Sequence, residues 1–175
     1  MANIMAATFR LMESKGPQEI TLRDVAAESG HGPRLIVRWF GGKGGLFEAI
    51  FMHVFADLNQ AGEMFYADLP TRPEVRKVFR LLSYMQMHHP EYVEAARQGE
   101  ILRTYTSRLE TVLNLPREQA DRVARRIITL VTGLALYSEM FGLTDDEVIE
   151  MVQNETKSLI GITPPARPPS YLSEK

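Results

Sequence analysis

Apolar residues recur three and four positions apart along most of the 175-residue chain, which is the period of an α-helix with one buried face. Ile4, Ala7 and Leu11 begin the first of these runs, and the Lys-Gly-Pro sequence at 15–17 ends it. No segment shows the sustained alternation that is typical of a half-buried strand. The pattern therefore predicts a chain built from helices.

Two short helices are expected next. Thr21 and Asp24 have the spacing of an N-cap residue and its partner, and the helix that they open ends after about two turns at Gly30. A glycine followed by Pro33 starts the second helix, because proline at the first helical position loses no hydrogen bond. This helix runs to Phe40 and ends in a Gly-Gly-Lys-Gly-Gly sequence.

Five longer amphipathic segments follow, and two of them begin with a threonine that has a glutamate three residues later, at Thr71 and Thr144. The expected helices run from Leu46 to about Gly62, from Thr71 to the His-His-Pro sequence at 88–90, from Tyr92 to Val112, from Leu115 to Gly142, and from Thr144 to Ile160. The proline-rich tail over 163–175 is expected to have no regular structure.

These elements predict an all-α fold, with an N-terminal three-helix unit of the helix-turn-helix type and a five-helix C-terminal bundle. The expected domain boundaries are 1–45 for the helix-turn-helix unit and 46–162 for the bundle, followed by the tail over 163–175.

Composition narrows the class of protein. With 45% hydrophobic residues the chain can bury a core, and it has no cysteine for disulfides or thiolate chemistry. Neither an export signal nor an apolar run of about 18 residues is visible, so we expect a cytoplasmic protein without a membrane partner. The formal net charge is −2, yet residues 1–45 hold six basic and four acidic side chains. The location of charge therefore permits binding to nucleic acid through the N-terminal unit.

The second helix of the expected helix-turn-helix carries a cationic face. Arg34 and Arg38 are four residues apart and share that face, whereas Ile36 and Phe40 are expected to pack inward. In a helix-turn-helix this helix enters the major groove of DNA. Lys43 follows at the start of the next helix, where an ammonium and backbone N–H groups can bind phosphate together. A solvated helix face is the alternative for two arginines in isolation, and their context favours DNA.

Residues 3 to about 58 resemble the DNA-binding domain of the tetracycline-repressor (TetR) family of bacterial regulators. The resemblance rests on "IMAATFRLMESKG", "TLRDVAAESG" and "RLIVRWFGGKGGLFEAI" as successive helical segments. The chain departs from the family pattern at His31, Gly32 and Pro33, where valine, serine and lysine are usual.

The resemblance implies roles for individual residues. It places Arg34 and Arg38 on the recognition helix, Trp39 at a position that contacts the DNA backbone, and Lys43 at a phosphate contact. The expected DNA-binding residues are Thr21, Gly32, Arg34, Leu35, Arg38, Trp39 and Lys43.

A homodimer is expected from both the pattern and the resemblance. Between Ile127 and Phe141 the helix is apolar nearly all round, so one side can face its own core and another needs a second partner. In the family the last two helices dimerise, which places two recognition helices on a palindromic operator. The expected interface residues are Ile127, Val131, Gly133, Leu134, Val148, Val152 and Leu159.

The resemblance further implies that the C-terminal bundle binds a small effector, which we expect to be apolar or amphipathic. Ligand pockets are mostly apolar with a few polar groups, although simple core packing is the alternative for each such residue. The candidate pocket residues, from the segments between 46 and 142, are Phe55, Phe65, Phe79, Leu82, Met85, Tyr105 and Tyr137.

No catalytic or metal site is expected. His88 and His89 are adjacent, so they point to different sides of a helix, and no carboxylate motif accompanies them. The Gly-Gly-Lys-Gly-Gly sequence lacks the preceding strand and the lysine-serine pair of a phosphate-binding loop. We therefore expect neither an enzyme nor a cofactor.

The sequence thus favours a dimeric, ligand-responsive transcriptional regulator, a repressor that an effector releases from its operator. The alternative is a helical sensor or interaction protein of the same fold that does not bind DNA.

Overall fold

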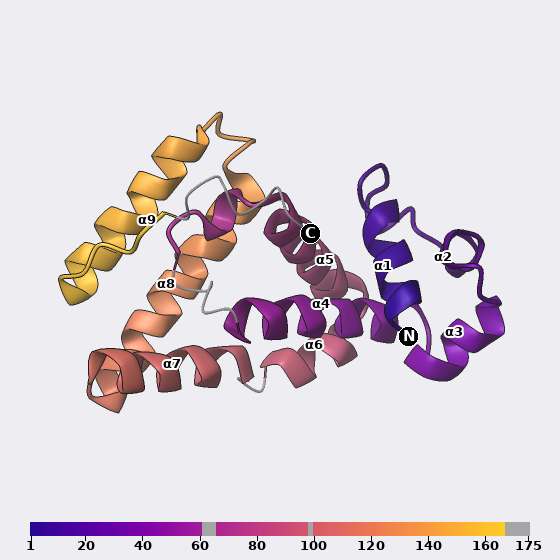
Figure 1. Cartoon of the computed structure of the whole chain (residues 1–175), viewed down its shortest axis with the longest axis horizontal. Coiled ribbons are helices and arrows are strands. Elements are labelled where there is room, and N and C mark those ends of the chain that lie inside the picture. Colours follow the sequence, from indigo (N-terminus) through magenta and orange to yellow (C-terminus); the bar gives the residue numbers. More distant parts are fainter. Residues whose placement is uncertain (61–65, 98–99, 167–175) are drawn as a thin grey trace. The chain divides into compact units, whose positions relative to one another are not determined.

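The computed structural model describes residues 1–60, 66–97 and 100–166, and these residues contain helices and no strand (Figure 1). The predicted all-α fold is confirmed. Contacts along the chain group it into two compact units. Unit one comprises Met1–Asp57 with Lys77–Gln98, and unit two comprises Leu58–Arg76 with Gly99–Lys175. Unit one therefore takes in more of the chain than the expected domain 1–45.

Unit one contains the N-terminal helices and an apolar core. Its elements are α1 (Ala2–Leu11), α2 (Leu22–Ser29), α3 (Pro33–Phe40), most of α4 (Lys43–Gln60), most of α5 (Pro73–His88) and α6 (Pro90–Arg97). Its core consists of Ile4, Met12, Ile20, Val25, Ile36, Phe40, Leu46, Phe47, Ile50, Leu81, Met85 and Val93.

The turn between α2 and α3 follows from local sequence. Thr21 caps α2 and forms the expected capping box with Asp24, each residue's backbone N–H donating to the other's side chain. Gly30 ends α2 with a φ of +71°, a left-handed conformation that favours glycine. Pro33 then begins α3, and Gly41 ends it.

Helices α4 and α6 make a close approach in unit one through glycine. A Cβ built on Gly45 would collide with the backbone carbonyl of Phe40, and one built on Gly44 would lie 2.5 Å from the Tyr92 ring. Both glycines are buried. The start of α4 therefore requires glycine because the α3 backbone and the Tyr92 ring occupy the space of a side chain.

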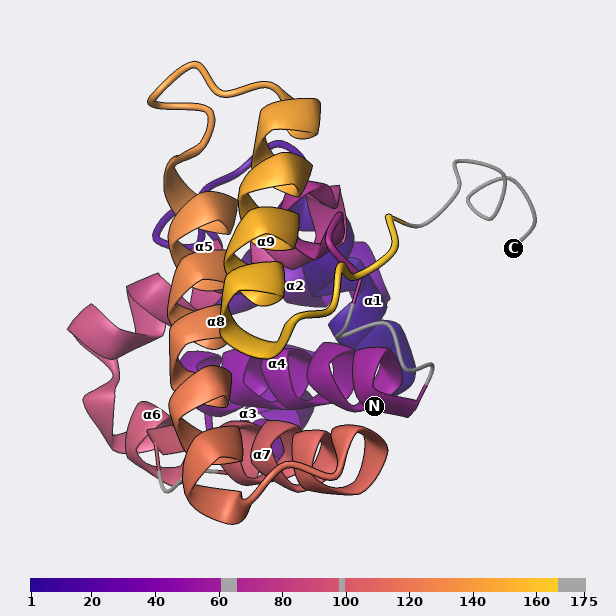
Figure 2. The same cartoon turned by 90° about the vertical axis from the view of Figure 1, so that its left-hand side faces the viewer.

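Unit two contains the remaining helices. Its elements are the short 3-10 helix η2 (Leu69–Thr71), α7 (Glu100–Leu113), α8 (Arg117–Tyr137) and α9 (Asp145–Ile160), with α8 and α9 side by side (Figure 2). Its buried apolar residues are Ala67, Leu69, Val75, Tyr105, Leu109, Ala120, Val123, Ala124, Ile127, Val131, Leu134, Ala135, Val148 and Val152.

Arg76 joins several segments of unit two. Its guanidinium donates to the Pro70 carbonyl at 3.0 Å, to Glu139 after α8 at 3.2 Å, and to Asp145 at the start of α9 at 3.0 Å. Hydrogen bonds to charged groups are stronger than neutral ones, so this arginine fixes the turn between α8 and α9.

Two expected helix boundaries were wrong. The helix expected from Tyr92 to Val112 is two helices, α6 and α7. Thr71 does not cap the next helix, because its hydroxyl donates to the carbonyl of Asp68, the residue that precedes η2, and α5 begins later, at Pro73. The second expected capping box is confirmed, since Thr144 and Glu147 hydrogen-bond reciprocally at the start of α9.

Candidate nucleic-acid interface

Helix α3 separates a buried face from an exposed cationic one. Ile36 is 0% exposed and Phe40 is nearly as well covered, so these two side chains anchor the helix on the core. Burying each one contributes about 1.5–3 kcal/mol relative to exposure. Arg34 and Arg38 are exposed, and Leu35 is partly buried. The anchored face thereby holds the two guanidinium groups toward solvent on a short rigid helix.

The four acidic side chains of residues 1–45 are already paired. The contacts are Glu13 with Lys77, Glu19 with the Gly16 backbone N–H, Asp24 with Lys15, and Glu28 with Arg10. Within residues 1–60, 66–97 and 100–166, Arg34 and Arg38 make no ion pair. The cationic face of α3 therefore keeps its charge available to an external anion.

Thr21 serves the helix cap in this structure. Its hydroxyl accepts from the Asp24 backbone N–H at 3.1 Å and donates to the Asp24 carboxylate at 2.7 Å. Hydrogen bonds from the Thr21 side chain and backbone, with a further one from Lys15, lower the pKa of Asp24 to about 2. Thr21 can donate its hydroxyl hydrogen to a phosphate only by giving up the bond to Asp24.

Lys43 lies at the start of α4 against aromatic rings. Its ammonium donates to the Gln18 carbonyl at 3.3 Å and lies 4.9 Å from the centre of the Tyr84 ring and 5.4 Å from that of Phe47. Such rings attract a cation through their electron-rich faces. An ammonium has three donors, so one bond to Gln18 leaves capacity for a phosphate oxygen.

The remaining expected DNA contacts lie on the same part of the chain. Gly32 is the exposed N-cap residue of α3, and a Cβ built on it would meet no atom within 4 Å. Trp39 is 38% exposed, and its ring centre lies 6.1 Å from that of His31 in the turn. Val37, which sequence reasoning left out, is also exposed on α3.

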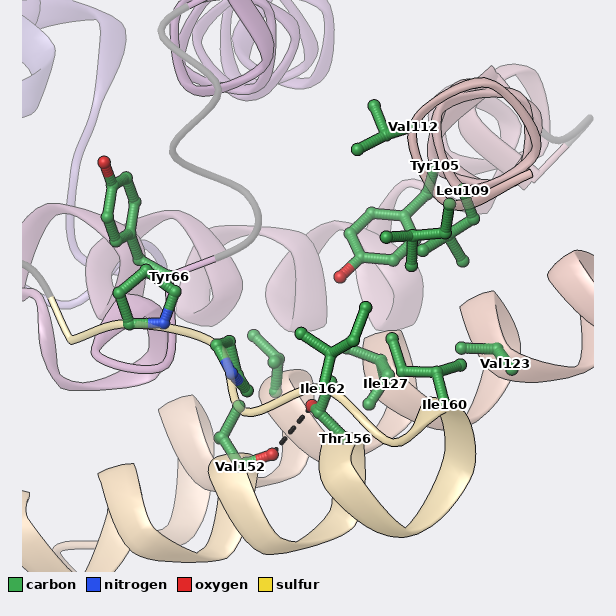
Figure 3. Close-up of a pocket in the computed structure, with 14 residues that line it drawn as sticks. Tyr66, Tyr105, Leu109, Val112, Val123, Ile127, Val152, Thr156, Ile160 and Ile162 are labelled. Carbon is green, nitrogen blue, oxygen red and sulfur yellow. Dashed lines mark hydrogen bonds between the residues drawn. The ribbon is translucent and has the colours of Figure 1, made fainter. Parts of the chain in front are cut away.

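The expected pocket residues are spread over both units. Met85 belongs to the core of unit one and Leu82 packs against that core, while Phe55 and Phe79 are partly buried in the same unit. Tyr137 is exposed on α8, and Phe65 lies outside the described residues. Of the expected residues that the structure describes, Tyr105 lines a cavity in unit two (Figure 3).

That cavity has a volume of about 150 Å³ and lies between α7, α8, α9 and the chain that follows α9. Its lining residues are Tyr66, Tyr105, Leu109, Val112, Leu113, Val123, Ile127, Val131, Val152, Thr156, Ile160, Ile162, Pro164 and Pro165. Sequence reasoning missed the walls from α9 and the tail. The apolar residues at the start of the proline-rich tail were the sequence feature that could have indicated this wall of the cavity.

The expected dimer residues lie mostly inside their own unit. Ile127, Val131, Leu134, Val148 and Val152 are buried in the single chain, whereas Gly133 and Leu159 are partly exposed. The large apolar side chains that α8, α9 and the turn between them expose are Tyr137, Met140, Phe141 and Met151.

Within the described part of the chain, no helix combines the length and apolarity needed to cross a membrane. The same residues hold no group of three or more histidine, cysteine, aspartate or glutamate side chains arranged to bind a metal ion.

Known proteins resemble the chain in its N-terminal helices and in its fold. Residues 4–50 match the model of the family described as "Bacterial regulatory proteins, tetR family". The HTH-type transcriptional regulator BetI of Stenotrophomonas maltophilia (strain R551-3) is 23% identical over 160 residues, which span 79% of this chain and 81% of that protein. A crystal structure titled as that of a putative transcriptional regulator from Pseudomonas aeruginosa PAO1 shares the fold. Its TM-score is 0.53 at 18% identity, and the match covers 91% of this chain and 89% of the other.

Proposed function

Because the chain belongs to the TetR family, whose members are DNA-binding transcription factors and not enzymes, we propose that it is a dimeric repressor that a small effector releases from a palindromic operator. The observation that carries the proposal is the exposed cationic face of α3, whose two arginines form no ion pair with any residue that the structure describes. Arg34 and Arg38 are positioned on a helix whose opposite face is buried, as a helix that enters a major groove requires.

The proposed contacts divide into two kinds. Arg34 and Arg38 read base edges, with guanine as the preferred target because its two acceptors match a guanidinium. Trp39 and Lys43 contact phosphates on either side of the groove. Thr21 and Gly32, the N-cap residues of α2 and α3, and Leu35 on α3 lie where these helices come close to the DNA. The phosphate contacts fix the register in which the arginines read the bases.

The proposed dimer uses α8 and α9. Phe141 is 70% exposed and Met140 is 68% exposed. Exposure of two large apolar side chains in one turn is unfavourable in water and marks a surface that a partner can cover. A Cβ built on Gly133 would meet no atom within 4 Å, so a second helix can approach the α8 backbone there. The interface would continue outward from the buried residues Ile127, Val131, Leu134, Val148 and Val152 and include Leu159.

A twofold dimer presents the α3 helices to two half-sites about 34 Å, or one DNA turn, apart. An effector bound in unit two would favour a dimer whose spacing no longer matches the operator. Such coupling is typically about 1–3 kcal/mol, which is roughly a 5–150-fold change in DNA affinity.

Genome-wide selection tests this function. Fragments of the genome that encodes the protein are incubated with the purified chain at physiological salt, and the captured fragments are sequenced. We expect enrichment of an inverted repeat that overlaps a promoter. A dimer that enriches no fragment over input DNA would favour the alternative, a sensor of the same fold that does not bind DNA.

A further inference from the structure

The cavity in unit two has the size of a site for one small ring. Its volume is about 150 Å³. An engineered apolar cavity of about 150 Å³ in another protein remains dry and takes up benzene or xenon. An apolar molecule of matching size gains by entering such a space, because contact with the apolar walls removes its surface and theirs from water.

The side chains that line the cavity disfavour a charged ligand. None of the fourteen lining residues carries a charged side chain, and most are aliphatic. An ion would lose its hydration there without gaining a partner. The polar side chains are Tyr66, Tyr105 and Thr156, and the Thr156 hydroxyl is occupied by a 2.7 Å bond to the Val152 carbonyl (Figure 3).

Tyr105 supplies the polar group that points into the cavity. Figure 3 shows its hydroxyl directed from α7 toward α9, and the residue is only 6% exposed. Burial raises the pKa of the phenol well above its ordinary value, so it stays neutral. A neutral phenol can exchange hydrogen bonds with a hydroxyl, carbonyl or ring N–H of a ligand.

One wall of the cavity is formed by the chain that follows α9, whereas helices form most of the others. Gly161 ends α9 in a left-handed conformation and turns the chain back, so that Ile162 and Pro164 cover the cavity. Two hydrogen bonds of 3.0 Å hold this stretch, from Gln153 Nε2 to the Pro164 carbonyl and from the Ala67 N–H to the Pro165 carbonyl. Residues 161–166, which we name the C-terminal strap, contain no helix or strand.

We propose that this cavity is a binding site for a small uncharged aromatic ligand with a single polar group, such as a phenol, and that the C-terminal strap is the wall that yields to admit it. The ligand's ring contacts α7, α8 and α9, and its polar group meets Tyr105. The site differs from the one expected from sequence, because α9 and the strap line it and α4 and α5 do not.

The regulatory consequence of this site rests on the proposed function. Helices α8 and α9 are those of the proposed dimer, and Val131 and Val152 line the cavity from them. A ring inserted between these helices changes their packing and hence the surface that they offer a second copy. Binding of the ligand itself needs neither DNA nor a dimer.

Calorimetric titration of the full chain with benzene, phenol and benzoate tests the site. We expect saturable binding of benzene and phenol, and benzoate at least tenfold weaker because its charge loses hydration. Tyr105→Phe should weaken phenol about fivefold to tenfold and leave benzene unchanged, since it removes one hydroxyl and keeps the ring. Tyr137→Phe, at an exposed tyrosine outside the cavity, is the matched control and should change neither ligand.

A second variant tests the location. Val131→Phe should fill the cavity and abolish binding of both ligands while circular dichroism shows a folded helical protein. If that variant does not fold, the Tyr105→Phe titrations decide. The proposal is overturned if neither benzene nor phenol binds the folded chain, if Tyr105→Phe leaves phenol affinity unchanged, or if benzoate binds as tightly as phenol. Sequence-specific DNA binding in the same samples would leave the proposed function standing in each of these cases.

Discussion

Single side chains on α3 and at the start of α4 differ in how much freedom they have to meet DNA. Arg34 and Arg38 are exposed, whereas the Lys43 ammonium already rests on the Tyr84 ring and bonds Gln18. In the proposed complex, the two arginine side chains can therefore adjust to the bases that they meet. Lys43 offers a charge at a fixed place, which suits the regular phosphate backbone.

This difference predicts distinct effects of two substitutions. Arg34→Ala should cost about 1–3 kcal/mol on the operator and reduce the preference for it over random DNA by the same amount, because base contacts carry the preference. Lys43→Ala should weaken operator and random duplexes equally. Arg122→Ala removes the same charge from α8 and serves as the control. Anisotropy titrations measure all three, and equal losses by Arg34→Ala on both duplexes would contradict its role.

The lowered pKa of Asp24 predicts that the free energy of unfolding depends on pH. Its pKa is lowered to about 2 by hydrogen bonds from Thr21, so the folded state favours the carboxylate. A lowered pKa adds stability above the ordinary value near 4, and that stability is lost as pH falls toward 2. Urea unfolding between pH 5 and pH 2 should show a smaller decline in Asp24→Asn, which keeps an acceptor but does not titrate. Parallel declines in both proteins would contradict the assignment.

At the scale of helices, the sequence predicted boundaries best where the cap is local. Thr21 with Asp24, and Thr144 with Glu147, form the capping boxes that their spacing indicates, because each partner lies within one turn of the other. Thr71 has the same spacing from its glutamate, yet its hydroxyl donates to the carbonyl of Asp68, the residue that precedes η2. A competing local acceptor upstream was not visible in the pattern.

The hydrophobic pattern of the sequence could not predict the cavity, for a different reason. Helical periodicity shows that Leu82, Met85 and Tyr105 each lie on an apolar face, but it does not show which faces meet. Met85 lies in the core of unit one and Leu82 packs against it, whereas Tyr105 lines a cavity in unit two. Contacts such as that of Ala67 with Pro165 join residues far apart in sequence, which no local signal encodes.

Substitution by alanine is expected to have opposite effects on stability at two helical glycines. Gly45→Ala should destabilise unit one by more than 1 kcal/mol, because its Cβ collides with the Phe40 carbonyl, a backbone atom that cannot move away alone. Gly133→Ala meets open space within the single chain, so in a chain kept monomeric by Phe141→Glu it should raise helix stability by up to about 1 kcal/mol. Urea denaturation of both variants measures this, and a stabilising Gly45→Ala would contradict the close approach.

At the scale of the whole molecule, the proposed function depends on two copies acting together. Phe141→Glu places a charge in the proposed interface and should shift sedimentation from dimer toward monomer by at least tenfold in dissociation constant. Met87→Glu alters a similarly exposed apolar side chain of unit one and is the matched control. Equal sedimentation of both variants and the parent chain would place the interface elsewhere.

Recognition of a specific operator by the α3 surface can be measured by a fluorescence-anisotropy titration. The intergenic DNA upstream of the chain's own gene is compared with a random duplex of equal length at two salt concentrations. We predict affinity for the upstream DNA at least about a thousandfold above that for the random duplex, and weaker binding to both at higher salt as phosphate contacts are screened. Equal affinity for the two duplexes at both salt concentrations would contradict the account.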